Sequence, residues 1–257
     1  MKPANLEAIN RSFEIQASGF ESKDVNFTKE DYLNYTISCV APNTQDTVLE
    51  VAAGTGACGR SFAPYVQSVV CLDATPCMLQ IGKQEAEKNG EKNMLFVKGY
   101  AEELPFLDNS FSIVFSRLAF HHFTDVKSPF SEMVRVLKPG GKLVMIDMEA
   151  AAEELRTVED EIEKLRDISH VKNMNKSEML DLFTENALSI KKCETTELQQ
   201  NLKNWLALTK TPELIQTEII NRMNADINGE EKTGFSPYME NGKICFNQKW
   251  TLIVGVK

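Results

Sequence analysis

The sequence lacks several features that would assign a protein to a specialised class. Its 257 residues contain only three histidines and two tryptophans, and its six cysteines include no Cys-x-x-Cys pair. Histidines and cysteines do not combine at the spacing of metal ligands, so we expect reduced thiols and no metal. No run of about 18 apolar residues is present, as a membrane-spanning helix would require. The N-terminal stretch has no apolar run of signal-peptide length, which predicts a cytoplasmic protein.

Basic residues are also scarce relative to acidic ones. The chain has 28 Lys and Arg against 37 Asp and Glu, for a formal net charge of −9. An acidic chain is not drawn to nucleic acid or to an anionic membrane surface, because both are negatively charged. We therefore expect a small molecule as the main partner.

Apolar runs of strand length alternate with amphipathic segments of helix length. We predict strands and helices in turn, with no internal repeat. The strands lie near 47–52, 67–72, 94–98, 111–116 and 141–147, and the helices near 59–65, 75–89 and 126–137. This alternation predicts an α/β fold with a doubly wound, mostly parallel sheet that helices cover on both faces.

The flanking segments predict one domain over residues 1–257. Residues 1–45 form an N-terminal helical cap with the apolar anchors Phe13, Phe20, Tyr32 and Tyr35, residues 46–148 form the ligand-binding core, and residues 149–257 carry insertions and closing strands. The last part contains helices near 177–186, 199–208 and 212–225, a strand near 188–194 and a final strand in "FNQKWTLIVGVK". The charged run 153–167 is interpreted as the solvated face of a helix.

A glycine loop follows the first strand, in "VLEVAAGTGACGR" at residues 48–60. Gly54, Gly56 and Gly59 satisfy G-x-G-x-x-G, a pattern typical of dinucleotide binding on a helix N-terminus. Glu50 contradicts that interpretation, because an acid four residues before the first glycine repels a pyrophosphate. The same acid attracts a ligand that carries an ammonium or sulfonium group.

Further candidate residues follow the other strands, at the edge of the sheet where ligands of parallel sheets bind. The second strand ends in Asp73, which is suited to accept both hydroxyls of a ribose, and Ala74 and Met78 offer apolar surface to an adenine. The fourth strand ends in Arg117 and leads to His121 and His122.

Five motifs in order resemble the class I S-adenosylmethionine (SAM)-dependent methyltransferases. Within that family the chain is most similar to the ubiquinone/menaquinone-biosynthesis-like small-molecule group, methyltransferase type 11. The resemblance is strong over about 45–150 and predicts a Rossmann-like, seven-stranded sheet. The motifs are "VLEVAAGTG", "VVCLDATPCML", "GYAEELPFLDNSFSIV", "LAFHHFTD" and "EMVRVLKPGGKLVMID".

The resemblance implies a SAM site in residues 46–148, with S-adenosylhomocysteine (SAH) as product. Glu50 and the loop backbone near Ala52, Gly54 and Gly56 would hold the methionine part and Asp73 the ribose, which leaves Gly59 incidental. The remaining cofactor-binding candidates are Ala74, Met78, Tyr100, Ala101, Glu102 and Arg117. Three positions depart from the family. Tyr100 replaces the aspartate that usually accepts from adenine, Phe111-Ser112 replaces the usual Phe-Asp at the start of the fourth strand, and Ala52 replaces the first glycine of the loop.

Methyl transfer from a sulfonium is an in-line displacement that depends on orientation and exclusion of water. The acceptor is expected to be a small organic molecule, bound by the N-terminal helices and by segments 149–176 and 197–245. His122 and His170 are the candidates for a general base, if a base is used. Two alternatives stay open: an NAD(P)-dependent oxidoreductase, favoured by the glycine spacing, and a non-catalytic SAM-binding module, favoured by Tyr100 and the absence of an evident base.

Overall fold

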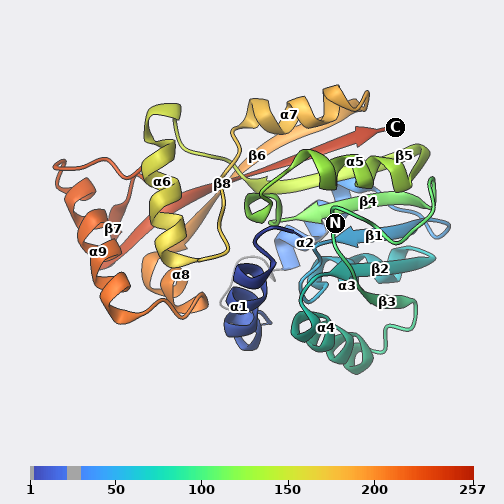
Figure 1. Cartoon of the computed structure of the whole chain (residues 1–257), viewed down its shortest axis with the longest axis horizontal. Helices are drawn as coiled ribbons and strands as arrows, with labels where there is room; N and C mark the ends of the chain where they lie inside the picture. The colour runs from blue at the N-terminus through green and yellow to red at the C-terminus, as the bar shows by residue number, and fades with distance from the viewer. Residues whose placement is uncertain (1–2, 22–29) are drawn as a thin grey trace.

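The fold is built on one mixed sheet, seen in a computed structural model that describes residues 3–21 and 30–257. The strands are ordered β3-β2-β1-β4-β5-β8-β6, and β7 pairs with the start of β8 (Figure 1). Their bounds are β1 Thr47–Val51, β2 Ser68–Asp73, β3 Met94–Lys98, β4 Phe111–Arg117, β5 Leu137–Met148, β6 Ser189–Asn201, β7 Tyr238–Glu240 and β8 Lys243–Val256. The predicted Rossmann-like fold is confirmed, with the short β7 added to the seven strands of the main path.

The first five strands are mutually parallel, as the alternation of strands and helices requires. The helices between them are α3 (Ala57–Phe62), α4 (Pro76–Asn89) and α5 (Lys127–Val136), with a 3-10 turn at Ala63–Tyr65. The fifth strand begins earlier than predicted, because Leu137 already pairs with Phe111 before the register shifts. Gly140, with φ of +74°, lies in this irregular part of β5.

Side chains of β1 alternate between the two faces of the sheet. Leu49 and Val51 belong to the apolar cluster that α5 and α7 (Lys176–Glu185) cover, whereas Val48 belongs to the cluster beneath α3. Because successive strand residues point to opposite faces, Glu50 shares the face of Val48. The sequence of β1 therefore directs the one acid of this strand toward the start of α3.

Of the closing strands, β8 reverses direction. β8 runs antiparallel to both β5 and β6, and its Trp250 pairs with Met148 on one side and Thr196 on the other. β6 extends to Asn201, beyond the predicted strand 188–194, so the helix expected from 199 begins only at α8 (Leu202–Leu208). The pairing of Asn201 with Cys245 accounts for the longer strand.

A helical cap lies at one end of the sheet. It contains α6 (Glu153–Arg166), α8 and α9 (Glu213–Ile227), which lie together around β7 and the start of β8 (Figure 1). These elements bury their own apolar cluster, made of Ile162, Leu202, Trp205, Leu206, Ile219, Met223, Phe235 and Phe246.

The charged run on α6 is a solvated face only in part, since Glu153, Glu154, Glu161 and Lys164 are exposed but a second charged face is buried. Arg156, Glu159, Asp160 and Glu163 are all buried. Arg156 donates to the carbonyl of Asn173, and Asp160 accepts from residues of the segment that follows α6. Charged side chains can be buried when each has a hydrogen-bond or ion-pair partner. The spacing of the four residues places them on one face of α6.

The N-terminal segment is helical where the structure describes it, with α1 (Leu6–Gln16), a 3-10 turn at Ala17–Gly19 and α2 (Glu30–Val40). α1 lies beside the junction of cap and sheet (Figure 1). Within residues 3–21 and 30–257, no helix is both long and apolar enough to cross a membrane.

Candidate active site

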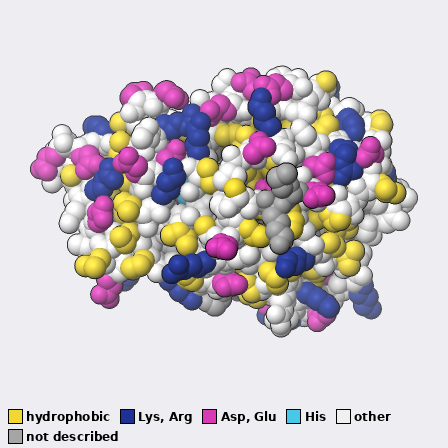
Figure 2. Space-filling model, in the orientation of Figure 1, with side chains coloured by type: hydrophobic (Ala, Val, Ile, Leu, Met, Phe, Trp, Pro, Cys, Tyr) yellow, Lys and Arg dark blue, Asp and Glu magenta, His cyan; other side chains and the backbone are white. Residues whose placement is uncertain are grey.

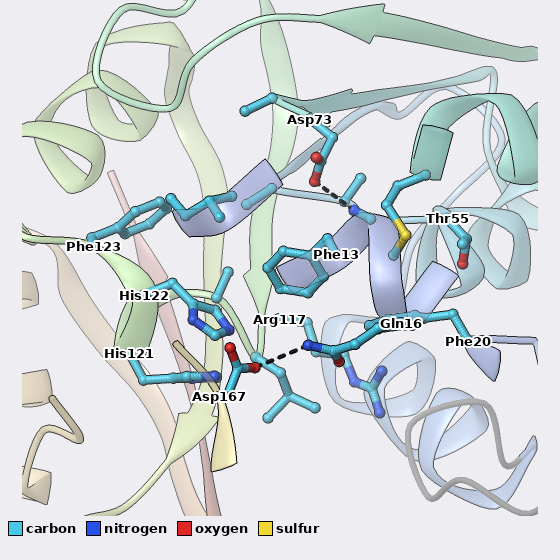
Figure 3. A pocket seen from close by; sticks show the side chains of 18 of the residues that line it. Phe13, Gln16, Phe20, Thr55, Asp73, Arg117, His121, His122, Phe123 and Asp167 are labelled. Carbon is cyan, nitrogen blue, oxygen red and sulfur yellow. Dashed lines mark hydrogen bonds between the residues drawn. The ribbon is translucent and has the colours of Figure 1, made fainter. Parts of the chain in front are cut away.

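A cavity of about 210 Å³ lies at the carboxyl ends of β1, β2 and β4, next to α1 (Figure 3). It is lined by all of the predicted cofactor residues except Gly56, namely Glu50, Ala52, Gly54, Asp73, Ala74, Met78, Tyr100, Ala101, Glu102 and Arg117. Gly56 has a packing role, because a Cβ there would lie 2.8 Å from Cys71 Sγ. The sheet thus brings residues from four separate loops to one space.

Glu50 is buried at the start of the glycine loop. Its Oε2 accepts from the backbone N–H of Gly59 at 2.8 Å and lies 3.6 Å from Cys71 Sγ. Burial raises the pKa of this carboxyl to about 7, although the Gly59 N–H and the charge of Arg117 act in the opposite direction. The site therefore holds an acid that ionises near neutral pH.

Gly59 is not incidental, which corrects the interpretation of the third glycine. A Cβ at Gly59 would lie 2.6 Å from Glu50 Oε2 and 2.8 Å from Cys71 Sγ. Such distances do not occur in real structures, so only glycine allows the helix backbone to approach the acid this closely. The third glycine thus serves the close approach to Glu50 and not the binding of a pyrophosphate.

Asp73 organises the turn after β2. Its Oδ2 accepts from the N–H of Gly54 at 2.7 Å, and its Oδ1 accepts from the N–H of Thr75 at 2.8 Å (Figure 3). Burial raises the pKa of Asp73 above its usual value, while these backbone donors oppose the shift. Each carboxylate oxygen has a further lone pair, so Asp73 retains acceptor capacity for hydroxyl groups of a ligand.

The loop after β3 contributes Tyr100, Ala101 and Glu102. Tyr100 and Glu103 form a short bridge, with the Glu103 N–H donating to the Tyr100 carbonyl at 3.2 Å. Glu102 Oε2 is buried without a hydrogen-bond partner among the described residues, and burial raises its pKa. A contact of Tyr100 with adenine remains a prediction.

Arg117 ends β4 and faces the opposite wall of the cavity. Its guanidinium lies 5.4 Å from the ring centroid of Trp250, a residue of β8. Sequence analysis predicted contacts from segment 197–245 without naming residues, and it missed the contribution of β8. The wall is supplied by β6, α8 and β8 through Gln200, Asn204, Trp205, Leu208, Gln248 and Trp250. Gln248 and Trp250 are two residues apart in a strand, and this period-2 spacing was the available signal.

The histidine pair lies in the 3-10 turn Phe120–His122. Asp147 holds this turn, since its Oδ2 accepts from the Phe120 N–H at 2.6 Å and its Oδ1 lies 2.6 Å from His121 Nδ1. Burial would lower the pKa of His121, but the Asp147 carboxylate raises it above its ordinary value. Burial together with His121 lowers the pKa of His122 to about 3, so the pKa values of the two rings are shifted in opposite directions.

The two candidate bases lie in different surroundings. His122 lines the cavity with Phe13 of α1, whose ring centroid lies 5.2 Å away (Figure 3). His170 is buried behind it, with Nε2 2.8 Å from Asp160 Oδ1, and is not among the lining residues. His170 is therefore buried and is not placed to meet a substrate directly.

α1 covers the cavity through polar and aromatic contacts. Gln16 donates to Asp167 Oδ2 at 3.0 Å, and Asn5 donates to the carbonyl of His122 at 2.9 Å (Figure 3). Phe13 and Phe20, two of the predicted apolar anchors, line the space with their rings 6.0 Å apart. Residues 22–29, which follow, are outside the described part of the chain.

Comparison with known proteins gives the same fold and the same family. Residues 49–145 match the family described as "Methyltransferase domain". The uncharacterized methyltransferase YcgJ of Bacillus subtilis is 32% identical over 233 residues, which cover 90% of this chain and 92% of YcgJ. The ubiquinone/menaquinone biosynthesis C-methyltransferase UbiE of Idiomarina loihiensis is 34% identical over 117 residues, 44% of this chain and 47% of that protein.

The crystal structure of YcgJ superposes with a TM-score of 0.82 at 31% identity, and the match covers 89% of this chain and 99% of YcgJ. The resemblance therefore extends through the cap and is not confined to the glycine-loop core. The chain belongs to the class I methyltransferases.

Proposed function

We propose that the protein transfers a methyl group from SAM to a small organic acceptor. The observation that carries the proposal is the pairing of two buried acids, Glu50 and Asp73, around one glycine loop at the edge of the cavity. When bound, SAM supplies an electrophilic methyl group on a sulfonium. The ammonium and the ribose of SAM need acidic partners.

The residues present fit such a ligand. Gly54 has φ of +56°, and a Cβ there would lie 3.3 Å from Met78 Cε, so the bare backbone leaves room beside an apolar side chain. Glu50 would hold the ammonium, Asp73 the ribose hydroxyls, and Met78 and Ala74 would contact the adenine. The chain's own work is to orient the two reactants and to exclude water.

The acceptor side is supported as a small-molecule site by its walls. Phe13, Phe123 and Trp205 give it apolar surface, and Gln200 and Gln248 add neutral polar groups. Figure 2 shows acidic and basic side chains interspersed on the face in view, without the continuous basic surface that nucleic acid attracts.

The test is ligand-induced stabilisation. SAH at about 100 times its dissociation constant is expected to stabilise the fold by about 2.7 kcal/mol, which raises the melting midpoint by several degrees, whereas NAD at the same concentration is expected to have no effect. Stabilisation by NAD alone would instead support the oxidoreductase alternative.

Asp73→Asn locates the site within that test. We expect SAH affinity to fall about tenfold or more, because a hydrogen bond to a charged acceptor contributes about 1.5–3 kcal/mol. Asp181→Asn, at an exposed position of α7, is the matched control. Release of SAH with pooled metabolites then separates an enzyme from a protein that only binds SAM.

A further inference from the structure

We propose that Ser169 and Asp167 are positioning residues that fix the imidazole of His122 with its proton on Nδ1, so that Nε2 accepts a hydrogen bond from a hydroxyl group of the methyl acceptor. The acceptor part of this inference rests on the proposed function, whereas the tautomer of His122 does not.

The direction of each hydrogen bond follows from the chemistry of Ser169. Its Oγ lies 2.6 Å from Asp167 Oδ1 and 3.1 Å from His122 Nδ1. A hydroxyl has one proton, and an ionised carboxylate can only accept, so this proton goes to Asp167. The Ser169 oxygen then faces Nδ1 as an acceptor, and Nδ1 must carry the ring proton.

Asp167 is held in the ionised state by donors from two segments. Ser12 of α1 donates to Oδ1 at 2.6 Å, Gln16 donates to Oδ2 at 3.0 Å, and the N–H of Ser169 donates to Oδ1 at 2.9 Å. Burial would raise the pKa of Asp167, but the pKa is held below its usual range, first by His122 and then by Arg166 and the hydroxyls of Ser12 and Ser169. A carboxylate with this many donors does not take a proton from Ser169 near neutral pH.

His122 is neutral in these surroundings. The charged and titratable groups that face it are His121 in the same turn and Asp167 and His170 in the segment after α6. Burial and His121 outweigh Asp167, which keeps the pKa of His122 near 3. A weakly basic Nε2 does not deprotonate an ammonium ion, but it serves an oxygen whose proton becomes strongly acidic while the oxygen is being methylated.

Methyl transfer to the acceptor hydroxyl forms one bond, breaks one bond and releases one proton. A lone pair of the acceptor oxygen forms the new O–C bond, the C–S bond breaks, and its electron pair stays on sulfur as a neutral thioether. The hydroxyl proton passes to His122 Nε2 and leaves to water with the products. The Phe13 ring, whose centroid lies 5.2 Å from that of His122, indicates that the hydroxyl belongs to a largely apolar molecule.

The tautomer is tested by nitrogen NMR on the full-length, ¹⁵N-labelled protein at pH 7. With three histidines the ring signals can be assigned by single substitutions. We expect His122 to be neutral and protonated on Nδ1 in the wild type and in Ser169→Thr, and to gain the Nε2-protonated form at least about tenfold in Ser169→Ala. The signals of His170 serve as an internal control.

Wild-type His122 protonated on Nε2, or an unchanged tautomer in Ser169→Ala, would overturn the inference. The Ser169→Thr variant is the control for loss of structure, because it changes the side chain but retains the hydroxyl. If SAH fails to bind while the tautomer is as expected, the proposed function fails and the positioning role stands.

The acceptor class is tested with two pools, one of phenols and alcohols and one of primary amines. We expect SAH release with the hydroxyl pool, a fall in kcat of about tenfold or more in Ser169→Ala, recovery in Ser169→Thr, and an SAH dissociation constant within about threefold of the wild type. No release with the hydroxyl pool, or release with amines alone, overturns the acceptor assignment.

Discussion

At the scale of single residues, the site depends on acids in places that ordinarily exclude them. Glu50 stands in a buried strand, and its carboxylate is tolerated because a helix N–H and two arginines compensate its charge. The cost of burial is visible as a pKa near 7. A ligand with a positive charge beside Glu50 would stabilise the carboxylate and lower its pKa again.

The first prediction follows from the sign of this shift. Glu50 must be ionised to attract an ammonium, and with a pKa of about 7 it is about nine-tenths ionised at pH 8 and about one-tenth at pH 6. SAH affinity is therefore expected to be up to about tenfold higher at pH 8 than at pH 6. Calorimetric titration across this range measures it. Glu50→Gln should bind more weakly and lose this dependence, and a wild-type affinity independent of pH would contradict the assignment.

The second prediction concerns Gly59. Gly59→Ala places a methyl group against Glu50 and Cys71, and such overpacking costs about 1–3 kcal/mol. We expect a lower melting midpoint and weaker SAH binding, since Glu50 must move. Gly19→Ala, which meets nothing within 4 Å, should change stability by no more than about 0.5 kcal/mol. Equal effects of the two substitutions would show that the contact with Glu50 is unimportant.

Sequence alone could locate Glu50, Asp73, Arg117 and His122, because each ends a strand or follows one, and parallel strands end at the same edge. The sequence analysis did not single out Asp147, although this residue ends the fifth predicted strand. The role of Ser169 could not be predicted, because it depends on which segments meet in space.

At the scale of elements, pairing decided the boundaries that local pattern misplaced. Residues 199–201 have no strong strand propensity, yet they continue β6 because β8 presents an unpaired edge opposite them. One charged face of α6 is buried for a related reason, since the segment after the helix folds back and supplies partners such as His170.

The third prediction addresses α1, which is tied to Asp167 by Ser12 and Gln16. Ser12→Ala removes a hydrogen bond to a charged group, worth about 1.5–3 kcal/mol, so amides of α1 should exchange about tenfold faster or more. Hydrogen exchange followed by mass spectrometry reports this. Amides of β1 and β4 should be unaffected, as should α1 in the control Ser38→Ala, whose hydroxyl bonds only within α2. Unchanged exchange of α1 would mean that other contacts hold it.

At the scale of the whole molecule, the order of the strands explains why one cavity has two kinds of wall. The parallel half of the sheet supplies acids and glycines from consecutive loops, as its repeating pattern predicts. The antiparallel half supplies aromatic and amide side chains from β6, α8 and β8, whose order in space differs from their order in the chain. The residues of the first wall could be named from the sequence, whereas those of the second could be assigned only to a broad segment until the fold was known.

β8 has a mechanical consequence. It is a single strand of 14 residues whose first part pairs with β7 in the cap and whose last part pairs with β5 in the core (Figure 1). Because one continuous hydrogen-bonded strand connects cap and core, it opposes a hinge motion that would separate them. The radius of gyration measured by X-ray scattering should therefore be the same with and without saturating SAH. Substrates would then enter and leave through movement of α1, because α1 contacts the cavity through side-chain bonds and not through sheet pairing. Cap and core would keep their relative positions during the catalytic cycle.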